Sequence, residues 1–207
     1  MEEVSSRRDQ VRDYVARKLY ALEQTQAEPA VRAALAKMRR GVGKKPGDDP
    51  ALWGMLFDDL PEQLEGRGAA PTREEWAIYT ALTLYALHQQ GHKRDSENMN
   101  ASDQSLGAAV ARLTEHDEGA VDAVRRRFNA MATSSDMEEL VWHLRGIVTL
   151  LRRSAIPLDY PMLATELFRF QTENGKAAVR LAWGRTYYAA YNRQKKTDES
   201  GKDDTNE

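Results

Sequence analysis

Two histidines, His88 and His92, lie four residues apart, a spacing that places two imidazoles on one helix face and could supply two metal ligands. Gly91 lies between them and favours a helix end at that point, and the chain has no HExxH pattern. Nearby carboxylates have the character of ordinary surface residues. We therefore expect no metal site here.

Three carboxylates, Asp58, Asp59 and Glu62, gather at the end of a predicted helix. General acid–base catalysis needs carboxyl groups that are held apart and partly desolvated, and the sequence gives no reason to expect that here. The segment GVGKKPG, residues 41–47, lacks the Walker spacing and the Ser or Thr that should follow it. The chain has no cysteine, which excludes thiolate chemistry and disulfides. We expect a protein without catalytic residues or cofactors.

Basic side chains are the more informative signal, because they recur at predicted helix ends and loops. The net charge is only −2, so the whole chain is not basic as a nucleic-acid-binding domain usually is. In a plain helical bundle the same residues would simply be solvated, and those at helix C-termini would be favoured by the helix dipole. The clusters are Arg39 and Arg40 with Lys44 and Lys45, Lys93 with Arg94, Arg125 to Arg127, and Arg152 with Arg153.

Helical geometry suggests that some of these residues share one surface. The apolar stripe of residues 121–131 would face the core, which leaves Arg125 and Arg126 at its boundary with solvent. Arg145 follows Leu144 and would flank the stripe of the next helix in the same way. Two adjacent helices would then form one basic strip that binds phosphates without reading bases.

The elements that position these residues are predicted to be helices from end to end. Apolar residues recur at three and four, and no segment shows the sustained alternation of a half-buried strand. We predict an all-α fold, a helical bundle of about nine helices. The expected N-terminal caps are Ser5 or Ser6, Asp49, Thr72 with Glu75, Ser135 with Glu138, and Asp159.

One domain is expected over residues 1–194, since 207 residues with 41% hydrophobic content suffice for one sizeable core. Residues 195–207, KKTDESGKDDTNE, lack apolar side chains and are predicted to form a flexible polar tail. The N-terminal segment is charged from its second residue, and no apolar run approaches the roughly 20 residues of a membrane span. We expect a cytoplasmic protein that does not contact membranes.

Four segments in the C-terminal half, taken together, resemble the CasB family, the small subunits of type I-E CRISPR Cascade complexes. They occur in the same order and at similar spacing as in that family, and weaker similarity makes the resemblance cover residues 39–191. The segments are SLGAAVARL from Ser105, VRRRFNAM from Val124, DMEELVWHLRGIV from Asp136 and IPLDYPMLATELFRF from Ile156.

The resemblance implies a non-catalytic antiviral-defence protein that contacts the crRNA and the displaced non-target strand of the target DNA, and so stabilises the R-loop. It also implies two copies of the chain beside the large subunit and the backbone subunits of Cascade. The basic positions that match the family's are Arg39, Arg40, Arg73, Arg125, Arg126 and Arg145, with Lys93 and Arg94 in the corresponding loop. Lys44 and Lys45 are added from charge alone.

Two other hypotheses stay open at this point. The chain could be a protein-only scaffold or adaptor subunit that joins its neighbours without touching nucleic acid. An enzyme that uses His88 or Asp58 is the third hypothesis.

Overall fold

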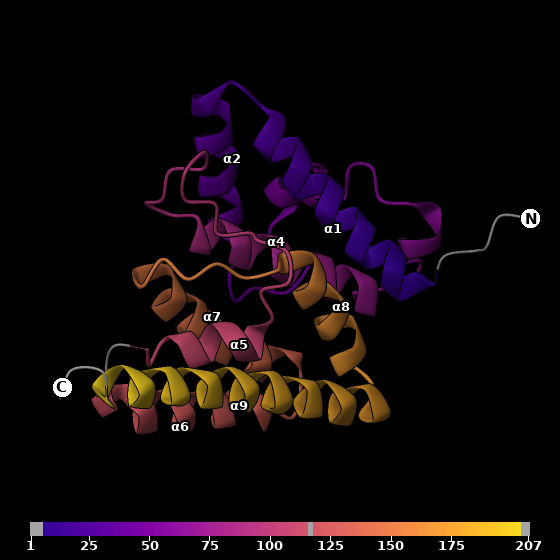
Figure 1. Cartoon of the computed structure of the whole chain (residues 1–207). Coiled ribbons are helices and arrows are strands. Elements are labelled where there is room, and N and C mark those ends of the chain that lie inside the picture. Colours follow the sequence, from indigo (N-terminus) through magenta and orange to yellow (C-terminus); the bar gives the residue numbers. More distant parts are fainter. Residues whose placement is uncertain (1–5, 116–117, 204–207) are drawn as a thin grey trace, which may run out of the picture.

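The computed structural model describes residues 6–115 and 118–203, with side chains as far as residue 196 except that of residue 118. Within those residues the chain forms nine α-helices and no strand, so the predicted all-α fold of about nine helices is confirmed (Figure 1). The helices are α1 (Arg7–Gln24), α2 (Glu28–Arg39), α3 (Trp53–Phe57), α4 (Arg73–His88), α5 (Leu106–Arg112), α6 (Val121–Ala132), α7 (Met137–Arg153), α8 (Tyr160–Phe170) and α9 (Glu173–Asp203). Short 3₁₀ turns are Pro50–Leu52, Glu62–Leu64 and Glu118–Ala120.

Side-chain caps begin several of these helices where the sequence predicts them. The Ser6 hydroxyl accepts a hydrogen bond from the backbone N–H of Asp9 at the start of α1. At α4, Thr72 and Glu75 form a complete capping box, because each side chain accepts from the other residue's backbone N–H. These interactions are local, which is why sequence spacing alone locates them.

The cap of α7 differs from the prediction by one residue. Asp136, not Ser135, is the N-cap, and its carboxylate accepts from the N–H of Glu139 at 2.9 Å. Glu139, not Glu138, then accepts from the backbone N–H and the hydroxyl of Ser135. Ser135 and Asp136 are both good capping residues, and spacing alone could not choose between the two adjacent registers.

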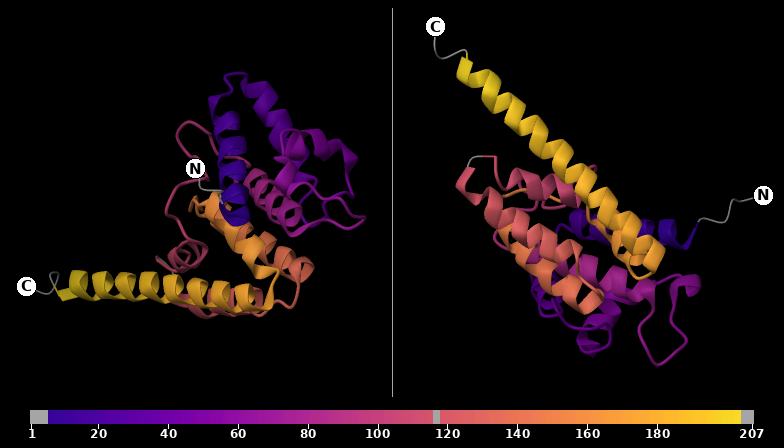
Figure 2. Two further views of the ribbon diagram at one scale, coloured as in Figure 1. Left: turned by 90° about the vertical axis from the view of Figure 1, so that its right-hand side faces the viewer. Right: turned by 90° about the horizontal axis from the view of Figure 1, so that it is seen from below.

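Helix α4 lies at the centre of the molecule and is buried on nearly every face between Ala77 and Ala86. It packs against α1, α2, α7 and α8, whereas α9 packs against α5 and α8. Helices α1 and α2 therefore lie on the opposite side of the body from α9 (Figures 1 and 2). Buried side chains from all nine α-helices form one hydrophobic cluster.

Helices α5 and α9 approach each other closely at Gly107. A methyl group there would overlap the carbonyl oxygen of Trp183, the backbone nitrogen of Tyr187 and the hydroxyl of Thr186. The glycine of the SLG segment thus has a packing role, because any side chain would push the two helices apart.

Helix α9 extends well past the rest of the body at its C-terminal end (Figure 2). The predicted polar tail is helical as far as Asp203, residues 204–207 lie outside the description, and the flexibility of this segment stays a prediction. None of the helices that the structure describes combines the length and the apolar character that crossing a membrane requires.

Candidate nucleic-acid interface

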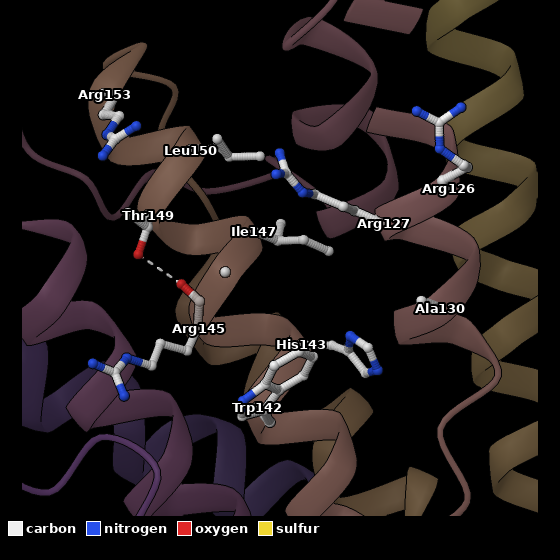
Figure 3. Close-up of a pocket in the computed structure, with 11 residues that line it drawn as sticks. Arg126, Arg127, Ala130, Trp142, His143, Arg145, Ile147, Thr149, Leu150 and Arg153 are labelled. Atoms are coloured by element: carbon white, nitrogen blue, oxygen red, sulfur yellow. Dashed lines mark hydrogen bonds between the residues drawn. The ribbon is translucent and has the colours of Figure 1, made fainter. Parts of the chain in front are cut away.

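Arginines of α6 and α7 surround a surface cavity of about 630 Å³, which we call the α6–α7 pocket. Helix α6 buries Val124 and Phe128, and α7 buries Leu144 and Val148, so the basic positions between them face outward. Arg126 and Arg127 of α6 and Arg145 and Arg153 of α7 are all exposed residues that line the pocket (Figure 3). The other lining residues are Ala130, Trp142, His143, Gly146, Ile147, Thr149 and Leu150.

The guanidinium groups of this pocket are spread out, not gathered at one point. Arg127 reaches toward Ile147 and Leu150, while Arg126 and Arg145 lie on different sides of the pocket (Figure 3). None of the pocket's four arginines forms an ion pair with a carboxylate among the described residues. Separated, uncompensated charges suit an extended polyanion better than a single small anion.

Arg125 does not belong to this pocket, although it is adjacent to Arg126 in the chain. Its guanidinium lies over the ring of Tyr191 of α9, 5.7 Å from the ring centroid, and 3.9 Å from the carboxylate of Asp122. Burial raises the pKa of Tyr187, which lies close by, and the positive charge of Arg125 opposes that shift. Successive helical residues point about 100° apart, so Arg125 and Arg126 reach different neighbours.

A second pair of predicted residues comes together at the end of α4. Arg39 of α2 and Lys93 of the loop after α4 line one cavity of about 380 Å³. The loop is held by Gln89, whose side-chain amide donates to the carbonyl oxygens of His92 and Glu97 and accepts from the N–H of Met99. Lys93 is exposed and, in the described part of the chain, has no ion pair.

Arg94 lines the same cavity as Lys93, but its guanidinium is already engaged. It donates to the backbone carbonyls of Leu22 and Thr25 at the end of α1, and it lies 3.3 Å from the carboxylate of Glu28. Only 10% of the side chain is exposed. These contacts tie the loop to the α1–α2 corner, which is a structural role that sequence spacing does not reveal.

The remaining predicted residues stand separately. Lys44 pairs with Asp49 at 3.1 Å, and Lys45 pairs with Glu138 of α7. Arg73 lies at the start of α4, with its guanidinium 4.3 Å from the ring centroid of Phe168. Arg40 is exposed at the C-terminal end of α2. The predicted set is thus divided among several surfaces, and Arg126 and Arg145 are the members that the α6–α7 pocket brings together.

The structure adds three residues to the predicted site: Trp142, and Arg127 and Arg153 from the basic clusters of the sequence. The sequence carries a signal for two of them, because Trp142, Arg145, Thr149 and Arg153 follow one another at intervals of three, four and four. That spacing places them on one face of α7, opposite its apolar stripe.

The two histidines considered as metal ligands have structural partners. The Nδ1 atom of His88 lies 3.0 Å from the Tyr160 hydroxyl in the core, and Nε2 of His92 lies 2.8 Å from the carbonyl oxygen of Arg152. Among the residues that the structure describes, no three His, Asp or Glu side chains gather as a metal site would require.

Fold and surface together define an all-helical protein with an arginine-lined outer pocket, and comparison with known proteins identifies its family. Residues 34–188 match the family described as CRISPR-associated protein Cse2. The crystal structure of CasB from Thermobifida fusca is 36% identical, with 86% of this chain and 97% of that chain covered and a TM-score of 0.72. The chain belongs to the CRISPR-associated Cse2 family, also called CasB, which confirms the resemblance found in the sequence.

A second solved structure shares the fold. CasB from M. ruber is 22% identical to this chain, with 89% of this chain and 97% of that chain covered and a TM-score of 0.64. Comparison with the curated proteins gave no match.

Proposed function

We propose that this chain is the non-catalytic small subunit of a crRNA-guided type I-E Cascade complex, and that it stabilises the R-loop in antiviral defence. The proposed partners are the crRNA, the displaced non-target strand, the large and backbone subunits, and a second copy of the chain in the cytoplasm. Membership of the Cse2 family supports this assignment.

The observation that carries the proposed nucleic-acid contact is the set of four arginines in the α6–α7 pocket, none of which pairs with a carboxylate in the described part of the chain. Arginine is the side chain best suited to phosphate, because its planar fork stays charged and donates several hydrogen bonds. Exchanging a DNA duplex for an RNA–DNA duplex is nearly balanced in free energy, so a few kcal/mol of contact with the freed strand decides which state persists.

The test is the salt dependence of target binding by the assembled complex. Replacing Arg126, Arg127 and Arg145 together by glutamine removes three charges while leaving polar, though shorter, side chains. The slope of log affinity against log salt is negative, and each lost contact with a single strand makes it shallower by about 0.7. Losing three contacts should therefore make it shallower by about two.

A matched control removes three charges from other exposed surfaces. Arg8, Arg12 and Arg67 are each paired with a carboxylate of this chain, and their triple glutamine variant should keep the wild-type slope. If the pocket variant also keeps the wild-type slope and affinity, the protein-only scaffold replaces our proposal.

A further inference from the structure

Trp142 is the most exposed large aromatic side chain in the described part of the chain, at 71% of its full accessibility. It lies on the outer face of α7, whereas the apolar stripe of that helix is buried. Its ring and that of His143 lie at a steep angle, with the centroids 4.8 Å apart, so the two rings are not stacked in parallel. The core therefore does not explain a tryptophan at this position.

Gly146, four residues further along α7, is unexplained by packing in the same way. A methyl group added there would have no neighbouring atom within 4 Å, so no close approach requires a glycine. Glycine in a helix interior is unfavourable compared with alanine. A side chain at this position would point back toward the turn that carries Trp142, and without one the surface there is open in the pocket that both residues line.

The surroundings of this open surface are cationic. Arg145 is on the same helix, and Arg126 and Arg127 contribute from α6 (Figure 3). An exposed indole and separated guanidinium groups that line the same pocket match a single-stranded nucleic acid, whose bases offer flat rings and whose phosphates are negative. A base inside a duplex is already stacked on both sides, so this chemistry selects a single strand.

We propose that Trp142 is a stacking platform for one unpaired base of a single-stranded nucleic acid, with Gly146 leaving room for that base and the arginines holding the flanking phosphates. This inference rests on the proposed function and deepens it. The α6–α7 pocket would then distinguish single-stranded from double-stranded nucleic acid, in addition to binding negative charge.

The test compares two fluorescent probes on the purified full-length chain at about 50 mM salt, where phosphate contacts are strong. One is a thymidine oligonucleotide, and the other is an abasic oligonucleotide with the same number of phosphates. Trp142→Ala should weaken binding of the thymidine probe roughly tenfold and leave binding of the abasic probe unchanged. Trp142→Phe should keep most of the affinity for the thymidine probe, because a phenyl ring can also stack on a base.

Two control variants separate the possible outcomes. Trp53→Ala removes another exposed tryptophan, on α3, and should affect neither probe. The triple glutamine variant of Arg126, Arg127 and Arg145 should weaken both probes equally. If only the arginine variant loses affinity, the stacking inference fails and the proposed function stands. If the wild-type chain binds neither probe, the stacking inference fails, and the salt dependence of the assembled complex still decides the proposed function.

Gly146→Ala provides an independent check that cannot be attributed to misfolding. Alanine favours the helix, so the melting temperature should rise by a few degrees. Affinity for the thymidine probe should nevertheless fall several-fold. Unchanged affinity would overturn the role given to Gly146. If the Trp142→Ala chain binds both probes normally but no longer assembles into the complex, the surface binds a protein partner and the stacking inference fails.

Discussion

The imidazole Nδ1 atom of His88 lies 3.0 Å from the hydroxyl oxygen of Tyr160, and both side chains are fully buried. Burial lowers the pKa of His88 to about 4 from its ordinary value of 6.5. Between these pH values the unfolded chain binds a proton that the folded chain does not. Stability from the neutral imidazole is therefore complete above pH 6.5 and falls as the pH is lowered to 4.

We predict that His88→Gln reduces this acid sensitivity by about 3 kcal/mol between pH 7 and pH 4. The check is urea unfolding of wild-type and variant chains at both pH values. Because each chain is compared with itself, a general loss of stability in the variant does not matter. Equal pH dependence in the two chains would show that His88 does not titrate as described.

Glu166 gives the opposite pH dependence. Burial raises its pKa to about 7, and a hydrogen bond from the indole N–H of Trp183, at 2.8 Å, partly opposes this shift. The folded chain thus holds a proton that the unfolded chain releases between pH 4.5 and 7, so stability falls as the pH rises through this window.

Glu166→Gln removes the charge but keeps an oxygen that accepts from Trp183. We expect it to stabilise the protein by about 2 kcal/mol at pH 8 and to have little effect at pH 4.5, measured by urea unfolding. The value allows for the partial exposure of the residue. An equal effect at both pH values would contradict the raised pKa. Because His88 and Glu166 change stability in opposite directions as the pH rises, their contributions to the pH dependence of the wild-type chain partly cancel.

Gly107→Ala should destabilise the protein by about 3 kcal/mol, because a methyl group would collide with the backbone of α9. Gly184→Ala on α9 is the matched control, since its added methyl group meets nothing within 4 Å and should stabilise the helix by about 1 kcal/mol. Thermal unfolding of the two variants measures the difference. Similar melting temperatures would mean that α5 and α9 are not in tight contact.

Arg94 and Lys93 are neighbours with different expected roles. Arg94→Ala should lower the free energy of unfolding by about 2 kcal/mol, because carbonyls of α1 lose their donors. Lys93→Ala should change it by less than about 0.5 kcal/mol, as is usual for exposed residues. Urea unfolding tests both values. A stable Arg94→Ala variant with impaired nucleic-acid binding would return Arg94 to the interface.

Features that depend on local spacing could be predicted from the sequence. Helical periodicity indicated the all-α fold, and the capping box of Thr72 and Glu75 is found where it was expected. The cap of α7 was displaced by one residue because adjacent positions carry two competent capping side chains.

Features that depend on tertiary partners could not be predicted in this way. Arg94 looked like a free cation in the sequence, but its partners Leu22 and Thr25 lie far away in the chain. Arg125 was grouped with Arg126 because they are adjacent, whereas Arg125 reaches Tyr191 of α9 and Arg126 lines the α6–α7 pocket. Helical spacing places Trp142 opposite the apolar stripe of α7, but it does not show that no other helix covers this side chain, which is 71% exposed.

The most direct test of the central claim is ultraviolet crosslinking of the assembled complex on target DNA, followed by mass spectrometry of this chain's peptides. We predict that nucleotides become attached to α6 or α7 peptides that contain Trp142 or Arg126. Crosslinks found only on other surfaces of this chain, with the α6 and α7 peptides unmodified, would contradict a nucleic-acid contact at the α6–α7 pocket.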